Sequence, residues 1–580
     1  MKTKTPSSSL PLEFVLISSF NVSNLGALLS KGEELPMLRT ISAPYGQVIQ
    51  TLLQQEVWGE SAHGAVIWTT PEAISLEYRK LLASEDATSD ALLGEVDEFC
   101  AAIKKIPKQV KYVFVPTWVA GAFEGRLGLL DMDAGRGVSF ALMRMNLRLV
   151  ENLREDTRVI VSDAARWVAV HGEKSFSPRF WYMSKTPYSV DLFKEAAAEI
   201  KAAMRALTGQ AKKLIVVDLD DTLWGGIVGD VGWQEVRLGG HDAIGEAFRD
   251  FQLALKSLQQ RGILLGIVSK NEERTALAAI RSHPEMVLRL DDFAGWRINW
   301  RDKAENISEL VSELNLGLQS VVFIDDNPVE RDRVRKALEE VLVPDWPTTP
   351  LEYKTALQRL RCFDLPQISA EDRKRSGMYA AERKRKEVFA NVGSVEAWLQ
   401  TLETRVIVES VSRANLERVT QLLNKTNQMN LSTRRLMKEE IWDWAQQREN
   451  TFLVFRVVDK YGDYGLAGIG SLSLTAGAEA TVTDFILSCR AMGRKVEETI
   501  LHVLSTRAKS GGATKLRACY LATSKNQPCL RFLESAGLQR NGEDEPFILD
   551  LAQPYPKPTA ISLELVPDSR EFQTGCRDEL

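Results

Sequence analysis

Three carboxylates, Asp218, Asp220 and Asp221, follow directly on the apolar run 214–217. Such a run predicts a buried β-strand, and like charges crowded at its end repel one another and lose hydration. A counter-charge is therefore expected beside them. Because hard divalent cations bind carboxylate oxygens, the stretch predicts a Mg²⁺ site.

Polar residues of fitting type recur at three later places along the sequence. Ser269 follows an apolar run, Lys303 lies on a loop before a predicted helix, and Asp325 and Asp326 end a further run. A single Asp-x-Asp-x-Thr match is weak, since acids at strand ends often cap the next helix or turn. All four groups in order, at the carboxyl ends of strands expected to be parallel, are far more specific for a site. The order resembles that of the haloacid dehalogenase superfamily.

The superfamily resemblance implies hydrolysis of phosphate esters. An aspartate nucleophile divides the displacement into two easier steps through an aspartyl-phosphate, and Asp218 holds that position. Asp220 is placed to protonate the leaving oxygen and then to activate water, whereas Asp221 fits a turn or capping role equally well. Mg²⁺ is expected on the carboxylates of Asp218 and of Asp325 or Asp326, and on the backbone carbonyl of Asp220. The residues expected to contact the phosphoryl group are Thr222, Ser269, Lys270, Asn271 and Lys303.

The segments between these groups leave no room for a cap domain. Residues 223–268 are accounted for by a Gly-rich turn, one helix and one strand, and residues 270–302 are shorter still. A cap encloses small substrates and excludes water from the reaction. An uncapped site favours a phosphate presented on something large.

Longer stretches of the sequence resemble one subfamily more closely. DLDDTLWGGIVGDVG, SKNEE, FIDDNPVER, NKTNQMNLSTRR and DFILSCRAMGRKVE together resemble the FkbH-like proteins of haloacid dehalogenase subfamily IIIC, over roughly residues 12–545. The resemblance implies a protein of polyketide biosynthesis with two substrates, 1,3-bisphosphoglycerate and a phosphopantetheinylated acyl carrier protein. Such a protein takes a glyceryl unit from the first, loads it on the second as a thioester, and removes its phosphate.

The carboxyl-terminal part resembles the GNAT acyltransferase fold. In that fold a strand leads into a loop whose backbone amides grip a pyrophosphate at a helix start. Here Arg490 and Gly493 match the first two anchors of that loop, and Arg494 is a further candidate binding residue, but Lys495 replaces a small residue and Leu533 replaces the usual general-acid Tyr. The loop is therefore expected to hold the phosphopantetheine arm of the carrier.

Cys489 ends the predicted strand that precedes this loop. A helix start and the neighbouring Arg490 lower the pKa of a thiol, so Cys489 is a candidate acyl relay. The alternative is a buried cysteine that only packs.

The segment 424–435 is dense in amides and cations. One interpretation is that it contacts glyceryl hydroxyls and phosphate. The other is a helix end and loop that satisfy their own backbone groups. The candidate binding residues are Asn424, Lys425, Thr426, Asn427, Gln428, Asn430 and Arg434.

Alternating strands and helices predict a multidomain α/β protein. The first domain resembles SGNH hydrolases but lacks Gly-Asp-Ser and an Asp-x-x-His pair, so we expect it to dock partners without hydrolysing. Asn21, His63 and Asp163 are its candidate binding residues. The expected parts are an SGNH-like doubly wound domain at 11–205, an uncapped haloacid-dehalogenase-like phosphatase domain at 206–365, a charged helical linker at 366–400, a GNAT-like α+β domain at 401–552 and a flexible tail at 553–580.

Composition limits the partners. The net charge of −5 gives no basic excess for nucleic acid, and the longest apolar runs are too short to span a membrane. Six scattered cysteines and an N-terminus without a signal-peptide pattern predict a cytoplasmic protein. Two alternatives to glyceryl loading remain open: a Mg²⁺-dependent phosphatase of a phosphoprotein or other macromolecule, and a docking scaffold with a degenerate acyltransferase domain.

Overall fold

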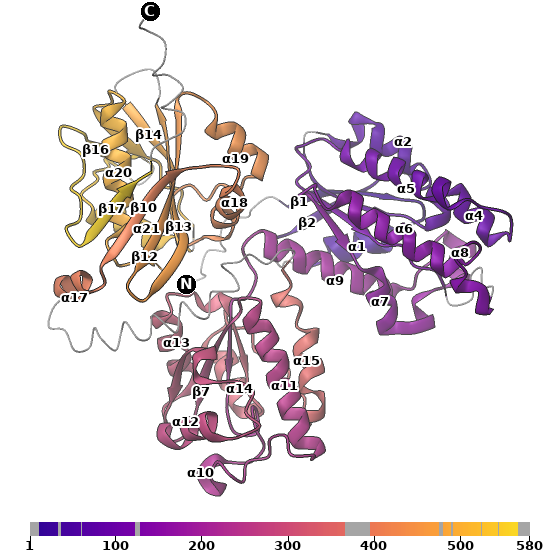
Figure 1. Ribbon diagram of the computed structural model, residues 1–580, viewed down its shortest axis with the longest axis horizontal. Helices are drawn as coiled ribbons and strands as arrows, with labels where there is room; N and C mark the ends of the chain where they lie inside the picture. Colours follow the sequence, from indigo (N-terminus) through magenta and orange to yellow (C-terminus); the bar gives the residue numbers. More distant parts are fainter. Residues whose placement is uncertain are drawn as a thin grey trace, which may run out of the picture. The chain divides into compact units, whose positions relative to one another are not determined.

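The structure is a computed structural model (Figure 1). Two compact units divide the chain, Met1–Arg205 and Ala206–Leu580. The structure describes residues 11–32, 36–59, 61–121, 128–365, 395–474, 479–488, 491–523, 525–542 and 545–566.

The first unit is built on a parallel sheet of five strands in the order β2-β1-β3-β4-β5. Each strand is an apolar run, and helices follow the strands, which gives the doubly wound α/β arrangement. The strands are β1 (Leu12–Ser18), β2 (Leu38–Ser42), β3 (Ala62–Trp68), β4 (Tyr112–Pro116) and β5 (Val159–Ser162). The helices are α1 (Ser23–Ser30), α2 (Val48–Leu53), α3 (Pro71–Ile74), α4 (Leu76–Leu82), α5 (Ser89–Lys104), α6 (Val138–Leu153), α7 (Ala164–His171), α8 (Pro178–Ser184) and α9 (Val190–Leu207).

The phosphatase-like domain opens the second unit with a parallel sheet of four strands in the order β8-β7-β6-β9. All of β6 and β9 is buried, because α11, α12 and α15 pack on one face of the sheet and α13 and α14 on the other. The strands are β6 (Leu214–Val217), β7 (Leu264–Ser269), β8 (Phe293–Ile298) and β9 (Val321–Ile324). The helices are α10 (Val228–Val231), α11 (Ala243–Gln260), α12 (Glu273–Ser282), α13 (Lys303–Glu313), α14 (Pro328–Ala337) and α15 (Tyr353–Arg359).

This domain has no cap. Between β6 and β7 the chain forms only a turn, α10 and α11, and between β7 and α13 it forms α12, a short 3-10 turn and β8. Every residue of both segments is described by the structure. The predicted uncapped α/β core is therefore confirmed.

The carboxyl-terminal domain is a mixed sheet in the order β16-β15-β14-β13-β12-β10-β17, with β11 paired to β14. Helices α20 and α21 pack on one face, and α18 and α19 on the other. A Cβ on Gly468 of β13 would lie 3.0 Å from Ile500 of α20, so the glycine permits close helix–sheet packing. The strands are β10 (Thr404–Ser410), β11 (Met429–Asn430), β12 (Asn450–Asp459), β13 (Gly462–Leu474), β14 (Glu479–Leu487), β15 (Lys515–Ala518), β16 (Phe547–Asp550) and β17 (Ile561–Leu565). The helices are α17 (Val395–Thr401), α18 (Leu416–Lys425), α19 (Lys438–Ala445), α20 (Val496–Ser510) and α21 (Gln527–Ser535).

The end of the chain differs from its prediction. Within the predicted flexible tail 553–580, residues Ile561–Leu565 form β17 and pair in parallel with β10. Ile561 is buried by this pairing, which gives the segment a reason to order. Most of the predicted charged linker, 366–394, and the last residues, 567–580, lie outside the described residues.

In the described part of the chain, no helix is both long and apolar enough to cross a lipid bilayer.

Candidate active site

The acid cluster forms where two neighbouring strands end. Strands β6 and β9 are paired in parallel with Val217 opposite Ile324, so the residues that follow them emerge side by side. The amide of Asp218 donates to the carbonyl of Ile324 at 3.0 Å and fixes this register. As a result, one carboxylate oxygen from each of Asp218, Asp325 and Asp326 lies within 4.8 Å of the others.

These three carboxylates suit a hard divalent cation. Asp218 Oδ1 is buried and has no hydrogen-bond partner among the described residues, so it is available as a ligand. Asp325 is completely buried, and burial together with the charge of Asp218 raises its pKa. The same two causes raise the pKa of Asp326. A bound divalent cation would relieve this mutual repulsion, and carboxylate oxygens are the ligands that Mg²⁺ prefers.

Lys303 supplies the fixed positive charge of the cluster. It is the first residue of α13, whose start is capped by the side chain of Asp302, and it is 3% exposed. Its Nζ lies 2.6 Å from Asp325 Oδ2 and 3.1 Å from Asp218 Oδ2. Burial lowers the pKa of this ammonium, but attraction to Asp218 and Asp325 outweighs burial and raises the pKa to about 12. Lys303 is therefore a permanent cation between the two acids.

Asp220 is held apart from this cluster by three donors. Its Oδ1 accepts from Trp224 Nε1 at 2.9 Å and from the amide of Val228 at 3.0 Å. Its Oδ2 accepts from Asn271 Nδ2 at 2.7 Å. Burial raises the pKa of Asp220, and the charge of Asp218 adds to this, while the three hydrogen bonds lower it. The net upward shift is what a residue that delivers a proton requires.

Other predicted phosphate contacts have structural partners. Thr222 is buried, and its Oγ1 lies 3.2 Å from both Asp326 Oδ1 and the Asp326 amide. Lys270 Nζ forms an ion pair with Glu330 at 2.6 Å. Ser269 is buried at the end of β7, on the same sheet edge as the acids. Asn271 contacts Asp220 and so orients its carboxylate.

Three supporting residues were not predicted from the sequence. Arg331 donates to the carbonyls of Asp325 and Asp326 at 2.7 and 2.6 Å and fixes the loop that carries both acids. Trp224 orients Asp220, and Tyr353 donates to the carbonyl of Asp221 at 3.1 Å. Arg331 and Trp224 lie within stretches that resemble the subfamily, but no chemical pattern assigns them these contacts.

Large apolar side chains are exposed on the loops and helix starts that follow the strands of this edge. We call four of them the apolar rim. Two lie at α10, one precedes Lys303, and one follows Asp326. They are Ile227 (51% exposed), Val231 (45%), Trp300 (75%) and Val329 (71%).

In the carboxyl-terminal domain, Cys489 and Arg490 lie outside the described residues. The amide of Gly493 donates to Glu497 Oε1 at 2.7 Å. A side chain of the same protein therefore accepts from the amide that was expected to bind a phosphate group. The Arg494 side chain is 4% exposed, contacts the hydroxyl and the ring face of Tyr464, and lies 3.6 Å from Asp459. These residues stabilise the loop from within.

The amide-rich segment divides into two groups. Asn424 exchanges hydrogen bonds with the backbone of Leu436, Asn430 accepts from Thr433, and Arg434 pairs with the buried Asp484. The side chains of these three residues therefore bind other groups of the same domain. The other four predicted residues line a pocket: Lys425, Thr426, Asn427 and Gln428.

The first unit does not bring its three candidate residues together. Asn21 and Asp163 follow β1 and β5, where Asn21 accepts from Ser23 and Asp163 caps α7. His63 lies near the start of β3, at the opposite end of the sheet, and accepts from the amide of Glu13. No catalytic triad forms from them.

No protein-family model matches the sequence, and no curated protein is significantly similar to it. Among solved structures, the chain is similar to the N-terminal part of BF1531 from Bacteroides fragilis, described as containing a phosphatase domain complexed with Mg. The two are 27% identical with a TM-score of 0.56, over 62% of this chain and 96% of that one. A GNAT-family acetyltransferase from Staphylococcus aureus is 11% identical with a TM-score of 0.21, over 25% of this chain and 99% of that one.

Fold and site together define the class of the central domain. It is a phosphatase-like domain whose fold is like that of the haloacid dehalogenases, preceded by a doubly wound α/β domain and followed by a mixed α+β domain.

Proposed function

We propose that the protein takes a glyceryl unit from 1,3-bisphosphoglycerate, loads it as a thioester on an acyl carrier protein, and removes its remaining phosphate. The resemblance to FkbH-like proteins of polyketide biosynthesis supports the choice of substrates. The observation that carries the phosphatase half is the convergence of Asp218, Lys303, Asp325 and Asp326 on an uncapped sheet edge.

In the phosphatase half, a carboxylate oxygen of Asp218 attacks the phosphorus atom of the 3-phosphate. The bond from phosphorus to the glyceryl oxygen breaks, and Asp220 donates its proton to that oxygen. A water molecule then attacks the aspartyl-phosphate while Asp220 accepts its proton, which releases inorganic phosphate and restores Asp218. Lys303, fixed beside the nucleophile, balances the negative charge that the phosphate brings.

Mg²⁺ bound by Asp218, Asp325 and Asp326 would supply further charge neutralisation for the phosphoryl oxygens. The Mg²⁺ in the similar Bacteroides fragilis structure supports this choice of metal. The residues of this chain then have separate roles: three carboxylates hold the ion, and Asp220, turned toward Trp224 and Asn271, transfers the proton.

The open site and its apolar rim support a substrate carried on a protein. Small-substrate enzymes exclude water with a cap, whereas a protein that delivers the phosphate can cover the site itself. Covering exposed apolar residues such as Trp300 and Val329 with a partner removes their surface from water, which favours binding of that partner.

In the acyl-transfer half, the Cys489 thiolate attacks the acyl carbon of the donor, and the bond from that carbon to the acyl-phosphate oxygen breaks, releasing inorganic phosphate. The carrier thiol then attacks the same carbon, and Cys489 leaves as a thiolate that is protonated or reused. The contact between Gly493 and Glu497 supports a donor other than an acyl-CoA, because the amide that would grip a pyrophosphate already has an acceptor.

One alternative is supported by the same open site, namely a phosphatase of another phosphorylated macromolecule. The two functions differ in their product. Loading adds a glyceryl group to a carrier protein, whereas a phosphatase alone only removes phosphate from a macromolecule that is already phosphorylated.

The test is to incubate the full chain with Mg²⁺, 1,3-bisphosphoglycerate and a phosphopantetheinylated carrier, and to weigh the carrier by intact-mass spectrometry. We expect a glyceryl adduct with the wild type, a phosphoglyceryl adduct with Asp218→Asn, and no adduct with Cys489→Ala. An unmodified carrier with the wild type, across several carriers, would refute loading. Loading by Cys489→Ala at the wild-type rate would assign Cys489 to packing.

A further inference from the structure

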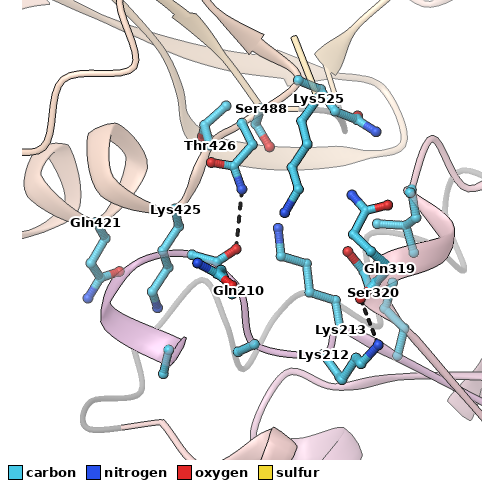
Figure 2. A pocket seen from close by; sticks show the side chains of 18 of the residues that line it. Gln210, Lys212, Lys213, Gln319, Ser320, Gln421, Lys425, Thr426, Ser488 and Lys525 are labelled. Carbon is cyan, nitrogen blue, oxygen red and sulfur yellow. Dashed lines mark hydrogen bonds between the residues drawn. The ribbon is translucent and has the colours of Figure 1, made fainter. Parts of the chain in front are cut away.

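A pocket lies in the second unit, between the phosphatase-like sheet and the carboxyl-terminal domain (Figure 2). Its cavity volume is about 130 Å³. One wall is formed by residues 210–213, which precede β6, and by residues within 315–320, which precede β9. The opposite wall is one face of α18 together with Ser488 and Lys525.

The lining of this pocket is strongly cationic. None of its lining residues, all of them described by the structure, is Asp or Glu. Side-chain amides and hydroxyls such as Gln210, Gln319 and Thr426 add neutral hydrogen-bonding groups (Figure 2). Positive charge with polar donors is the combination that binds anions. The five cationic residues are Lys212, Lys213, Arg418, Lys425 and Lys525.

Burial disfavours the charged form of two of these lysines, Lys212 and Lys525. Lys525 extends toward the Lys212–Lys213 pair from the opposite wall (Figure 2). Burial lowers the pKa of Lys212, and repulsion from Lys525 lowers it further. Burial likewise lowers the pKa of Lys525, with a contribution from Arg435. Attraction to the exposed Glu340 does not offset burial at either lysine, and no acidic residue is among the described residues that line the pocket.

The pocket is separate from the phosphatase site. Lys213 immediately precedes β6 and Asp218 immediately follows it, so the two sites lie at opposite edges of the sheet. Five residue steps along an extended strand place Lys213 and Asp218 about 17 Å apart along the strand direction. On the other side, Ser488 lines the pocket at the end of β14, next in sequence to Cys489.

We propose that this pocket binds the phosphate monoester of a phosphorylated three-carbon acid, as the donor site for acyl transfer. The identification of the ligand as an acyl donor rests on the function proposed above, whereas the anion site itself does not. A phosphate monoester carries close to two negative charges at neutral pH, which suits several cations. The phosphodiester of a pantetheine arm carries only one and is the alternative source of the same chemistry.

Calorimetric titration of the full chain with 3-phosphoglycerate tests the proposal. A chelator is included, because without metal the three carboxylates of the phosphatase site repel anions. We expect Lys212→Gln and Lys525→Gln each to weaken binding about tenfold, the loss of one charge-assisted hydrogen bond. The matched control is Lys509→Gln, an exposed lysine of α20 that donates to the carbonyl of Ala552. It should bind within twofold of the wild type.

Two further titrations distinguish the ligand sources, one with phosphopantetheine and one with inorganic phosphate. The proposal is supported if 3-phosphoglycerate binds more tightly than both and only the pocket variants lose it. It is overturned if the wild type does not bind 3-phosphoglycerate, if the pocket variants bind it normally, or if phosphopantetheine binds more tightly.

Melting temperatures show whether the variants fold. Without ligand, Lys525→Gln should melt at or above the wild-type temperature, because it removes a desolvated charge that repels its neighbours. With Mg²⁺, its hydrolysis of an aryl phosphate should equal that of the wild type, since the phosphatase site lies at the other sheet edge. Carrier loading is a separate measurement, so a failure of loading with 3-phosphoglycerate binding intact would reject the proposed function and leave the anion site standing.

Discussion

At the scale of single residues, neighbouring acids in one short stretch have different roles because their partners differ. Asp218 has an oxygen without a hydrogen-bond partner among the described residues and lies beside Lys303, Asp220 is hydrogen-bonded through both oxygens with a raised pKa, and Asp221 is exposed. The Asp221 carboxylate accepts from the amide of Gly226 at 2.8 Å, and its φ of 53° is that of a left-handed turn. Environment, rather than residue type, assigns each role.

This difference makes a matched pair of variants informative. Asp220→Asn keeps the size and hydrogen-bonding oxygen of the side chain but cannot transfer a proton, so kcat for an aryl phosphate should fall by about 10²- to 10⁴-fold. Asp221→Asn retains an acceptor for the Gly226 amide and should stay within a few-fold of the wild type. Steady-state hydrolysis with Mg²⁺ measures both. Equal losses in the two variants would contradict the assignment of Asp220 as the proton donor.

Glu497 is the other residue with a clear physical consequence. It is 5% exposed, its Oε2 has no hydrogen-bond partner among the described residues, and burial raises its pKa to about 7. The folded chain therefore holds a proton that the unfolded chain has released above its ordinary pKa near 4.5. By linkage, this group makes the domain less stable as pH rises from about 4.5 to about 7.

Glu497→Gln should remove that pH dependence while keeping an acceptor for the Gly493 amide. Above pH 7.5, we expect the variant to be more stable than the wild type by about 2–3 kcal/mol, with little difference near pH 5. Hydrogen exchange of the α20 amides in the full chain, compared at the two pH values, reports the change. A stability difference that is the same at both pH values would show that Glu497 is not titrating.

At the scale of elements, parallel pairing of β6 with β9 brings distant acids together, and the loops after the strands then present the apolar rim. The rim lies on segments that also carry Asp220, Lys303 and Asp326. A partner that covers the rim therefore also covers the reacting groups.

Trp300→Ala tests whether the rim contacts the carrier. We expect kcat/KM for a phosphoglyceryl-carrier to fall about tenfold or more, because an exposed aromatic buried in an interface often dominates binding. Hydrolysis of a small aryl phosphate should be unchanged. Leu253→Ala on α11, 45% exposed, is the control and should affect neither substrate. A loss on both substrates would instead assign Trp300 to the structure of the site.

At the scale of the whole molecule, the second unit carries two sites of opposite charge on one sheet. The carboxyl edge gathers acids that suit a cation, and the amino edge gathers lysines that suit an anion. Among the described residues one cluster consists mainly of acids and the other mainly of lysines, so each should be stabilised by a ligand of the opposite charge.

Metal removal tests the acidic edge. Saturating Mg²⁺, at about one hundred times its Kd, should stabilise the domain by about 2.7 kcal/mol over the chelated protein. Differential scanning calorimetry of the full chain measures the shift. Asp325→Asn should reduce the shift strongly while leaving the chelated protein as stable or more so, because it removes one of three repelling acids. A Mg²⁺ shift of wild-type size in this variant would contradict the assigned ligand set.

The phosphatase-like site was predictable because its residues occur in a fixed order, three of them after apolar runs and Lys303 just before a helix. Asp218, Ser269, Lys303 and Asp325 are each read from a local pattern, and parallel pairing then brings strand ends to one edge. The α/β class and the lack of a cap follow from segment lengths in the same way. Strand β17 was missed because its pairing with β10 joins distant segments, and nothing in its irregular neighbourhood indicates that partner.

The sequence by itself thus predicted the acid cluster that the structure shows, together with the chemistry proposed for it. Only the tertiary structure decided that Gly493 meets Glu497, that Asn424 and Arg434 satisfy their own segment, and that the lysine pocket exists. The pocket combines residues near positions 212, 425 and 525, each unremarkable alone. The physical reason is that strand-end chemistry is encoded locally, whereas a cavity between packed domains depends on contacts between segments far apart in the chain.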